Sequence, residues 1–346
     1  MEAEGREFLY CGGTSYLGMA RNEDFATLLA EGMRRYGTNY ASSRISNLQL
    51  RIFEEAESHL AAYAGAEAAL TVSSGYLAGQ MVVKTFQGNG HFLYAPGTHP
   101  AVWLETPILS EPDYTTWTAH LIARIHAEPA TDWVLVCNSL DPLLARRHRF
   151  DWIRQLPSSR TFTLLIDDSH GFGLIGREGA GIYSELTVPD HVRLVVVSSF
   201  GKAFGIPGGV ILSDRATVER LKRSPFFGAS SPVIPAYLYA FLRAGDLYQR
   251  ARARLSANIR QFAQRALPTG LLQTFPDYPV FYTPVNDLYA HLKEQNVLIS
   301  SFPYPSPQDN CLTRIVLNSL HTEADVDRLA NLVEQYAARY SPSPTT

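Results

Sequence analysis

One lysine carries the clearest chemical signal in this sequence. The chain has only four lysines: Lys84, Lys202, Lys222 and Lys293. Lys202 lies in SSFGKAFGIPGG, directly after an apolar run and among serines and glycines. A partly desolvated lysine has a lowered pKa and becomes an amine nucleophile that can form a Schiff base. The alternative is a solvated loop lysine, and the small and apolar neighbours of Lys202 favour the reactive interpretation.

A second cluster, IDDSHGFG, places two carboxylates and a histidine at the end of another apolar run. Asp167 stands where a strand would end, and His170 follows three residues later. There a carboxylate can project into a ligand crevice. A capped helix start would use the same residue types, so the motif alone leaves both interpretations open.

A third segment, TVSSGYLAGQ, leads from an apolar run through Ser74, Gly75 and Tyr76 into a helical stretch. Hydroxyls, backbone N–H groups and the positive end of a helix dipole together favour phosphate binding. Many turns in α/β proteins look similar, and neither nucleotide signature, GxxxxGK[ST] or GxGxxG, is present.

Two isolated residues are weaker candidates. His99, in YAPGTHPAV, could stack on a flat ligand, although a structural or solvated histidine is the commoner case. Arg314 lies inside the apolar run LTRIVLNSL and needs a partner if buried, either a ligand carboxylate or a structural acceptor. All five features together suit pyridoxal 5′-phosphate, which needs a lysine for its aldehyde, a carboxylate for its ring nitrogen and a phosphate cradle.

The elements that must position these residues alternate between short apolar runs and helical stretches. The runs are AALTV, WVLVC, FTLLI, LVVVS and GGVIL. They are continuously apolar, which is typical of strands covered on both faces, and they predict an α/β domain with a doubly wound, mostly parallel sheet. We expect an N-terminal segment (1–40), a large domain (41–233), a small α+β domain (234–340) and a tail (341–346).

Composition excludes several other classes of protein. The chain has 346 residues, a net charge of −3 and 46% hydrophobic residues, which is globular and not polybasic. Its three cysteines form no CxxC pair, so we expect a reducing compartment and no metal cluster. With no secretory signal and no membrane-length apolar run, a cytoplasmic location is expected.

Longer stretches resemble the α-oxoamine synthase family of fold-type I pyridoxal-phosphate enzymes. IDDSHGFGLIGREGAG is similar to that family's VDDAHGTGVIGEQGRG, and SSFGKAFGIPGG to its TFGKGFGVSGG. TSYLGMA resembles its N-terminal NDYLGLA. The resemblance covers residues 10–338 and implies a homodimer with shared active sites.

The resemblance also implies roles for individual residues. Lys202 would form the Schiff base and transfer protons, Asp167 would pair with the ring nitrogen, and His170 would contact the ring hydroxyl. His99 would stack on the ring. The phosphate would be held by Ser74, Gly75, Tyr76 and Ser199, with Ser230 or Ser231 reaching the partner subunit's phosphate. Arg314 and Thr14 would bind the substrate, with Thr14 standing where the family often has asparagine.

One stretch departs from the family pattern. NSLDPLLAR (138–146) replaces EGVFSMDGD, so that Asn138 stands in place of an acidic residue, and the family serine is replaced by Pro142 or displaced to Ser139. The predicted activity is the condensation of a small α-amino acid with an acyl thioester such as acyl-CoA, with decarboxylation to an aminoketone. The departure keeps an aminotransferase open as the alternative. A catalytically silent cofactor-binding homologue is the non-enzymatic one.

Overall fold

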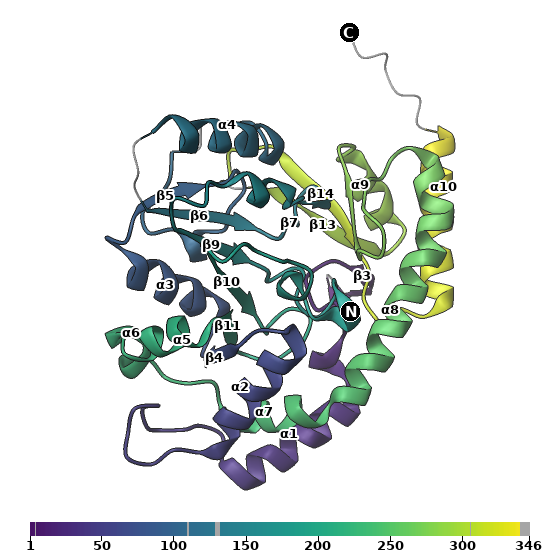
Figure 1. Cartoon of the computed structure of the whole chain (residues 1–346). Helices are drawn as coiled ribbons and strands as arrows, with labels where there is room; N and C mark the ends of the chain where they lie inside the picture. Colours follow the sequence, from purple (N-terminus) through teal and green to yellow (C-terminus); the bar gives the residue numbers. More distant parts are fainter. Residues whose placement is uncertain (4, 109–110, 129–131, 305, 340–346) are drawn as a thin grey trace. The chain divides into compact units, whose positions relative to one another are not determined.

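The computed structural model describes residues 1–3, 5–108, 111–128, 132–304 and 306–339 (Figure 1). The expected tail, 341–346, lies outside these residues. The chain forms two compact units. The smaller unit comprises Met1–Gly18, Asp141–Arg146 and the chain from Tyr248 onward, and the larger comprises Met19–Leu140 and Arg147–Leu247.

A six-stranded sheet is the centre of the larger unit. Its strands, in spatial order, are β4 (Ala68–Val72), β11 (Gly209–Ser213), β10 (Val192–Ser199), β9 (Phe162–Asp167), β6 (Trp133–Asn138) and β5 (His91–Tyr94). Strands β10, β9, β6 and β5 pair in parallel, and β11 is antiparallel to both of its neighbours. The expected α/β fold with a mostly parallel sheet is confirmed.

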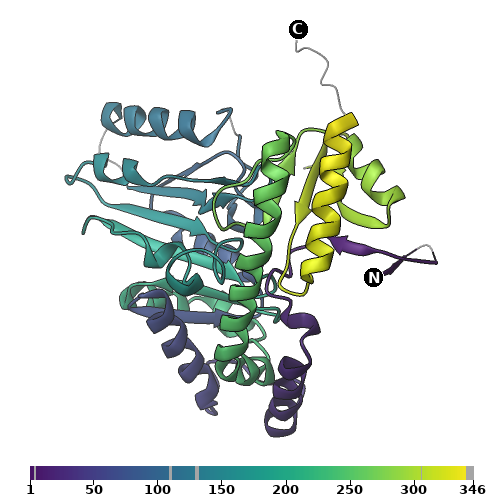
Figure 2. The ribbon, with the colours of Figure 1, turned by 90° about the vertical axis from the view of Figure 1, so that its right-hand side faces the viewer.

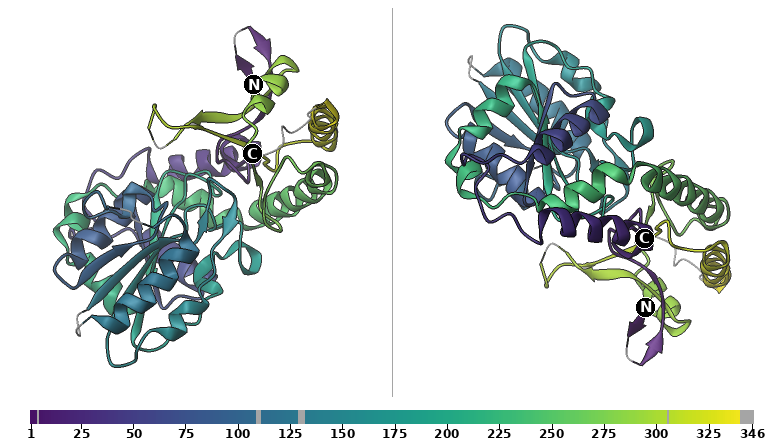
Figure 3. Two further views of the ribbon diagram at one scale, coloured as in Figure 1. Left: turned by 90° about the horizontal axis from the view of Figure 1, so that it is seen from above. Right: turned by 90° about the horizontal axis from the view of Figure 1, so that it is seen from below.

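Helices cover both faces of this sheet, as Figure 3 shows. The helices of the larger unit are α1 (Glu23–Tyr36), α2 (Arg51–Ala64), α3 (Gly75–Phe86), α4 (Tyr114–Ala127), α5 (Arg215–Lys222), α6 (Pro225–Ala229) and α7 (Pro235–Arg243). Short 3₁₀ turns are η1 (Met19–Arg21), η2 (Pro100–Val102), η3 (Asp151–Gln155), η4 (Arg177–Gly179) and η5 (Ile182–Ser184). Because both faces are covered, the strand residues are buried continuously along β6 and β9.

The core under α3 shows which way the strand side chains point. Val136, Leu165 and Val195 are adjacent in register on β6, β9 and β10, and all three pack in one cluster with α3. Strand side chains alternate between faces, so Asn138 and Asp167, two residues further on, face the same side. This register brings an amide and a carboxylate together at the carboxyl edge of the sheet.

The smaller unit contains a second, four-stranded sheet. Its order is β12 (Val280–Thr283), β14 (Cys311–Val316), β13 (Val297–Pro303) and β3 (Leu9–Cys11). Its helices are α9 (Asp287–Glu294), α10 (Glu323–Arg339) and most of α8 (Gly245–Ala266), which is followed by η6 (Leu267–Thr269). Helices α8 and α10 run side by side (Figure 2), joined by the ion pair between Arg265 and Glu334. Four further strands have two residues each: β1 (Glu2–Ala3), β2 (Arg6–Glu7), β7 (Leu140–Asp141) and β8 (Arg146–Arg147).

No helix within the described part of the chain is both long enough and apolar enough to cross a membrane.

Candidate active site

The carboxyl ends of the parallel strands gather polar side chains at one edge of the large sheet. Asn138 ends β6, Asp167 ends β9 and Ser199 ends β10. Asn138 and Asp167 are direct register partners. Open α/β sheets bind ligands at this edge, so this is the candidate active site.

Lys202 lies in the turn between β10 and β11, among buried apolar side chains that include Phe200, Ala203 and Phe204. Burial lowers the pKa of Lys202, and the nearby negative charge of Asp167 partly opposes that shift. A lowered pKa increases the fraction of neutral amine near pH 7, and the neutral amine is the nucleophile. The structure therefore places Lys202 and Asp167 within electrostatic reach of each other.

Asp167 is buried, with 9% of its surface exposed. Its Oδ1 accepts a hydrogen bond from the backbone N–H of Ser169 at 2.9 Å. This bond fixes the orientation of the Asp167 carboxyl group at this edge of the sheet.

His99 lies close enough to sense both of these groups. Burial lowers the pKa of His99, Asp167 opposes that shift, and the positive charge of Lys202 reinforces it. The Nδ1 atom of His99 accepts a hydrogen bond from the N–H of Ala101 at 3.1 Å, which fixes the ring as the N-cap of η2. His99, Asp167 and Lys202 thus form one electrostatic cluster from three loops.

A turn suited to phosphate lies beside this cluster. Ser74 caps α3, its Oγ accepting the N–H of Leu77 at 3.0 Å. The first N–H groups of a helix have no partner inside it, so those of α3 other than the Leu77 N–H are available to an anion. A Cβ on Gly75 would lie 2.6 Å from the Cβ of Ser199, so only glycine allows this approach. Tyr76 follows with its side chain exposed.

Ser199 is held in place by its own hydrogen bonds. Its N–H donates to Ser169 Oγ at 3.0 Å, and its Oγ accepts the N–H of Gly201 at 3.2 Å. The serine hydroxyl and the start of α3 therefore form a fixed pair next to Lys202.

Three further predicted residues of the larger unit are His170, Ser230 and Ser231. His170 is half-buried in the turn after β9. Ser230 ends α6 and donates to Phe227 O at 3.3 Å, and Ser231 is exposed next to it. Their predicted roles toward a cofactor stay predictions.

Arg314 and Thr14 belong to the smaller unit. Arg314 lies on β14 between Tyr282 and Ser300, and its Nη1 donates to Pro142 O at 2.8 Å. Its Nε is buried and has no hydrogen-bond partner within the described residues. Thr14 is half-buried. Their substrate-binding role stays a prediction.

Sequence reasoning did not assign a site role to Asn138. Its Nδ2 donates to Gly97 O at 2.7 Å, in the loop that leads to His99. A carbonyl can only accept, so this bond fixes the amide orientation and leaves Oδ1 facing elsewhere. That Oδ1 is buried without a partner in the described structure. The signal was available, because Asn138 follows an apolar run as Asp167 does.

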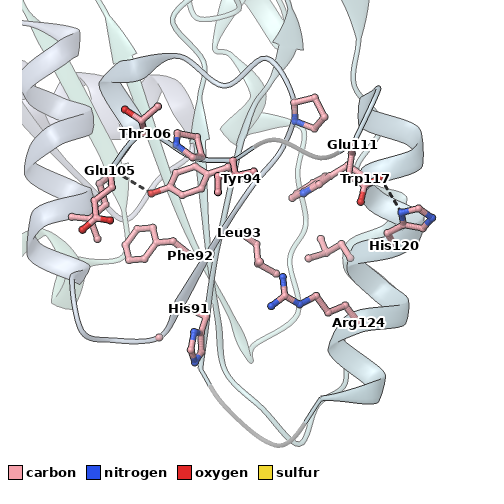
Figure 4. Close-up of a pocket in the computed structure, with 16 residues that line it drawn as sticks. His91, Phe92, Leu93, Tyr94, Glu105, Thr106, Glu111, Trp117, His120 and Arg124 are labelled. Carbon is pink, nitrogen blue, oxygen red and sulfur yellow. Dashed lines mark hydrogen bonds and ion pairs between the residues drawn. The ribbon is translucent and has the colours of Figure 1, made fainter.

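Two hollows of the larger unit lie away from this edge. One, of about 520 Å³, lies between β5 and α4 and is lined by aromatic and charged side chains, among them Tyr94 and Trp117 (Figure 4). On its wall, Glu111 and His120 form an ion pair at 2.9 Å. The other, of about 670 Å³, is lined by residues near the amino ends of the central strands, such as Trp133 and Phe162. No predicted site residue lines either hollow.

The residues at the carboxyl edge fit pyridoxal 5′-phosphate. They offer a lysine amine with lowered pKa, a carboxylate beside it, a helix N-terminus and an unpartnered buried acceptor. Together with the doubly wound large unit, these groups define the class: a fold-type I pyridoxal-phosphate transferase.

The chain belongs to the aminotransferase class I and II family, whose model matches residues 16–333. It is 28% identical to an 8-amino-7-oxononanoate synthase from Nitrosomonas europaea, over 96% of this chain and 91% of that one. The same enzyme from Azoarcus sp. is 27% identical over 96% and 89%.

Solved structures show the same fold. A serine palmitoyltransferase from S. paucimobilis with PLP and myriocin bound superposes with a TM-score of 0.83, at 19% identity, covering 97% of this chain and 88% of that one. The 8-amino-7-oxononanoate synthase of Francisella tularensis gives 0.75 at 18% identity, over 96% and 98%. The expected resemblance to the α-oxoamine synthase family is confirmed.

Proposed function

We propose that this protein uses pyridoxal 5′-phosphate to condense a small α-amino acid with an acyl thioester such as acyl-CoA. The products would be an aminoketone, CO₂ and the free thiol. The observation that carries the proposal is the cluster of Lys202, Asp167 and His99, together with the close approach of Gly75 to Ser199. The names of the relatives support acyl transfer as the reaction.

When bound, pyridoxal 5′-phosphate supplies an electron sink that stabilises negative charge at the α-carbon of the amino acid. Each residue then has a role that follows from its surroundings. The Lys202 Nζ, with its lowered pKa, is the amine that holds the cofactor and accepts the α-proton. The Asp167 carboxylate keeps a proton on the ring nitrogen.

The other groups would bind and orient the cofactor and the substrate. Ser74, Gly75, Tyr76 and Ser199 would bind the phosphate, His99 would cover one ring face, and His170 would contact the ring hydroxyl. Ser230 and Ser231 would reach the phosphate in a partner subunit. Arg314 and Thr14 would bind the substrate, the buried, unpartnered Nε of Arg314 being suited to a carboxylate oxygen.

The departure at Asn138 favours a second candidate, an aminotransferase using the same cofactor residues. An amide at this position does not repeat the acidic residue of the α-oxoamine synthase pattern. An aminotransferase would convert the cofactor to its amine form with an amino acid alone and would need no thioester. A catalytically silent homologue would bind the cofactor and do neither.

The visible absorption spectrum and the release of CoA and CO₂ together separate these functions. We expect the purified protein to be yellow with pyridoxal 5′-phosphate, and to release CoA and CO₂ only when a small amino acid and an acyl-CoA are both present. Bleaching by an amino acid alone would support the aminotransferase. A protein that binds the cofactor and turns over neither substrate set would be a silent homologue, and one that takes up no cofactor would overturn the proposal.

We also propose a homodimer in the cytoplasm. Ile45 and Leu48 are exposed by 65% and 61% in the loop before α2, and Phe226 on α6 by 40%. This loop packs on α6, where Ser43 Oγ donates to Gly228 O at 2.6 Å. The apolar surface therefore adjoins Ser230 and Ser231 and suits a second copy. The free thiols of Cys11, Cys137 and Cys311 suit a reducing compartment.

A further inference from the structure

Asp168, the residue after the proposed ring-nitrogen partner, is completely buried. Its Oδ2 accepts the N–H of Ile182 at 2.8 Å. Within the described residues it makes no salt bridge. An ionised carboxylate buried without a cation is strongly disfavoured, and such a group takes up a proton instead.

The Ser139 side chain lies within interaction range of the Asp168 carboxyl group, where it favours the ionised form. Asp168 Oδ1 and Ser139 Oγ are both buried, and neither has a partner with full hydrogen-bond geometry in the described structure. The Ser139 N–H donates to Asp167 O at 2.9 Å, which fixes Ser139 beside the end of β9. Within the described residues, Asp168 Oδ1 therefore has no strong hydrogen-bond donor to offset its burial.

Two glycines enclose this carboxyl group. A Cβ on Gly171 would overlap Asp168 Oδ1, and a Cβ on Gly181 would overlap Oδ2. The carboxyl group is therefore closely packed on both of these sides.

The backbone of Asp168 anchors the turn that follows β9. Its N–H donates to Val197 O at 2.8 Å, and its carbonyl accepts the N–H groups of Gly171 and Phe172 at 2.9 and 2.8 Å. Together with the bond from Ile182, these contacts join both ends of the turn 168–182, which carries His170. Any charge on Asp168 would also lie next to Asp167.

Burial and the charges around Asp168 also affect its pKa. Burial raises the pKa of Asp168 to about 7, and the negative charges of Asp167 and Glu185 add to the shift. Hydrogen bonding by Ser139 and Ile182 opposes it. The two adjacent carboxyl groups thus have different surroundings, one with a lysine in reach and the other without a cation.

We propose that Asp168 is a positioning residue that occupies the folded state as a neutral acid and that it fixes the turn presenting Asp167 and His170. The neutral form leaves Asp167 as the one negative charge at this point of the edge. The relevance of Asp168 to catalysis rests on the proposed function, whereas its protonation state is independent of that function.

The first experiment uses the cofactor-free protein, so its outcome is independent of the proposed function. Asp168→Asn keeps the shape and cannot ionise. An acid with a raised pKa in the folded state loses stability as pH rises from the unfolded pKa to the folded one. The ratio of wild-type to variant unfolding constants should therefore rise about thirtyfold between pH 5.5 and 8.5, measured by urea unfolding. A ratio that stays flat or falls would overturn the proposal.

Ser139→Ala provides a second measurement, should Asp168→Asn fail to fold. Removal of the hydroxyl should move the inflection in stability to higher pH, because Ser139 lowers the pKa of Asp168. The exposed Asp309, whose side chain accepts hydrogen bonds from Ser306, gives the matched control Asp309→Asn, and this should leave the inflection in place. An inflection that stays in place or moves to lower pH in Ser139→Ala would contradict the proposed surroundings of Asp168.

The positioning role is tested with the cofactor. Asp168→Asn should bind pyridoxal 5′-phosphate within about threefold of wild type, whereas Asp168→Ala, which loses the Ile182 bond, should bind at least tenfold more weakly. Equal binding by both variants would remove the positioning role. Failure of the wild type itself to bind would count against the proposed function, while the unfolding result would still stand.

Discussion

The Cα of Gly75, at the start of α3, lies so close to Ser199, at the end of β10, that a Cβ added to Gly75 would be 2.6 Å from the Cβ of Ser199 and 2.8 Å from its Cα. The two residues are separated by 124 positions in the sequence (199 minus 75). Their contact joins the helix N-terminus to the strand end on which Lys202 follows three residues later. The proposed phosphate site depends on this approach.

Gly75→Ala should therefore weaken the binding of pyridoxal 5′-phosphate at least tenfold, because the methyl group forces α3 away from Ser199. Equilibrium dialysis of the cofactor measures this. Gly245→Ala is the matched control, since nothing lies within 4 Å of a Cβ there and its φ is not positive. Unchanged affinity in Gly75→Ala would exclude this turn as the phosphate site.

Lys202→Ala should abolish the retention of cofactor after borohydride treatment, and with it all turnover. Intact-protein mass spectrometry detects the retained mass. Lys222→Ala is the control, because Lys222 lies on the surface in an ion pair with Glu219. A cofactor mass that persists in Lys202→Ala would place the attachment on another lysine.

Asp167→Asn should lower the pKa of Lys202 further. Asp167 raises that pKa in the wild type, while burial lowers it, so removal of the negative charge leaves burial unopposed. In the cofactor-free protein, the pH midpoint for acylation of Lys202 by acetic anhydride, followed by peptide mass spectrometry, should shift downward. An upward shift would mean that the two groups do not interact as the structure indicates.

Asn138→Asp should destabilise the fold by about 2–3 kcal/mol, because it replaces a donor to Gly97 O with a buried charge next to Asp167. Urea unfolding at pH 8 measures the loss, which should diminish as the pH falls and the new carboxyl group takes up a proton. Asn310→Asp, at an exposed position, is the control. Equal stability of the two variants would show that the Asn138 amide carries no structural bond.

The sequence by itself determined the fold class and the family. Continuously apolar runs imply strands covered on both faces, and parallel strands bring their carboxyl ends to one edge. Asp167 and Lys202 could be chosen because each follows such a run. The resemblance of the two long motifs to those of a known family then supported the cofactor.

The break between α7 and α8 could not be predicted from the sequence. The stretch 234–266, rich in Ala, Leu, Arg and Tyr, looks helical in sequence, and the structure divides it into α7 and α8 at Ala244, whose backbone (φ −90°, ψ 14°) leaves the helical region. A periodic apolar pattern continues across such a break and does not reveal it.

Only the tertiary structure decided how the site is assembled from distant parts of the chain. Asn138, Ser139 and Asp168 each have a buried side-chain atom without a partner in the described structure, and sequence does not show burial or partnership. The approach of Gly75 to Ser199 depends on the order in which β4, β11 and β10 pair. Composition and periodicity describe each element alone, whereas the contacts of a site depend on which elements are neighbours and in what register, and that is fixed by packing across the whole sheet.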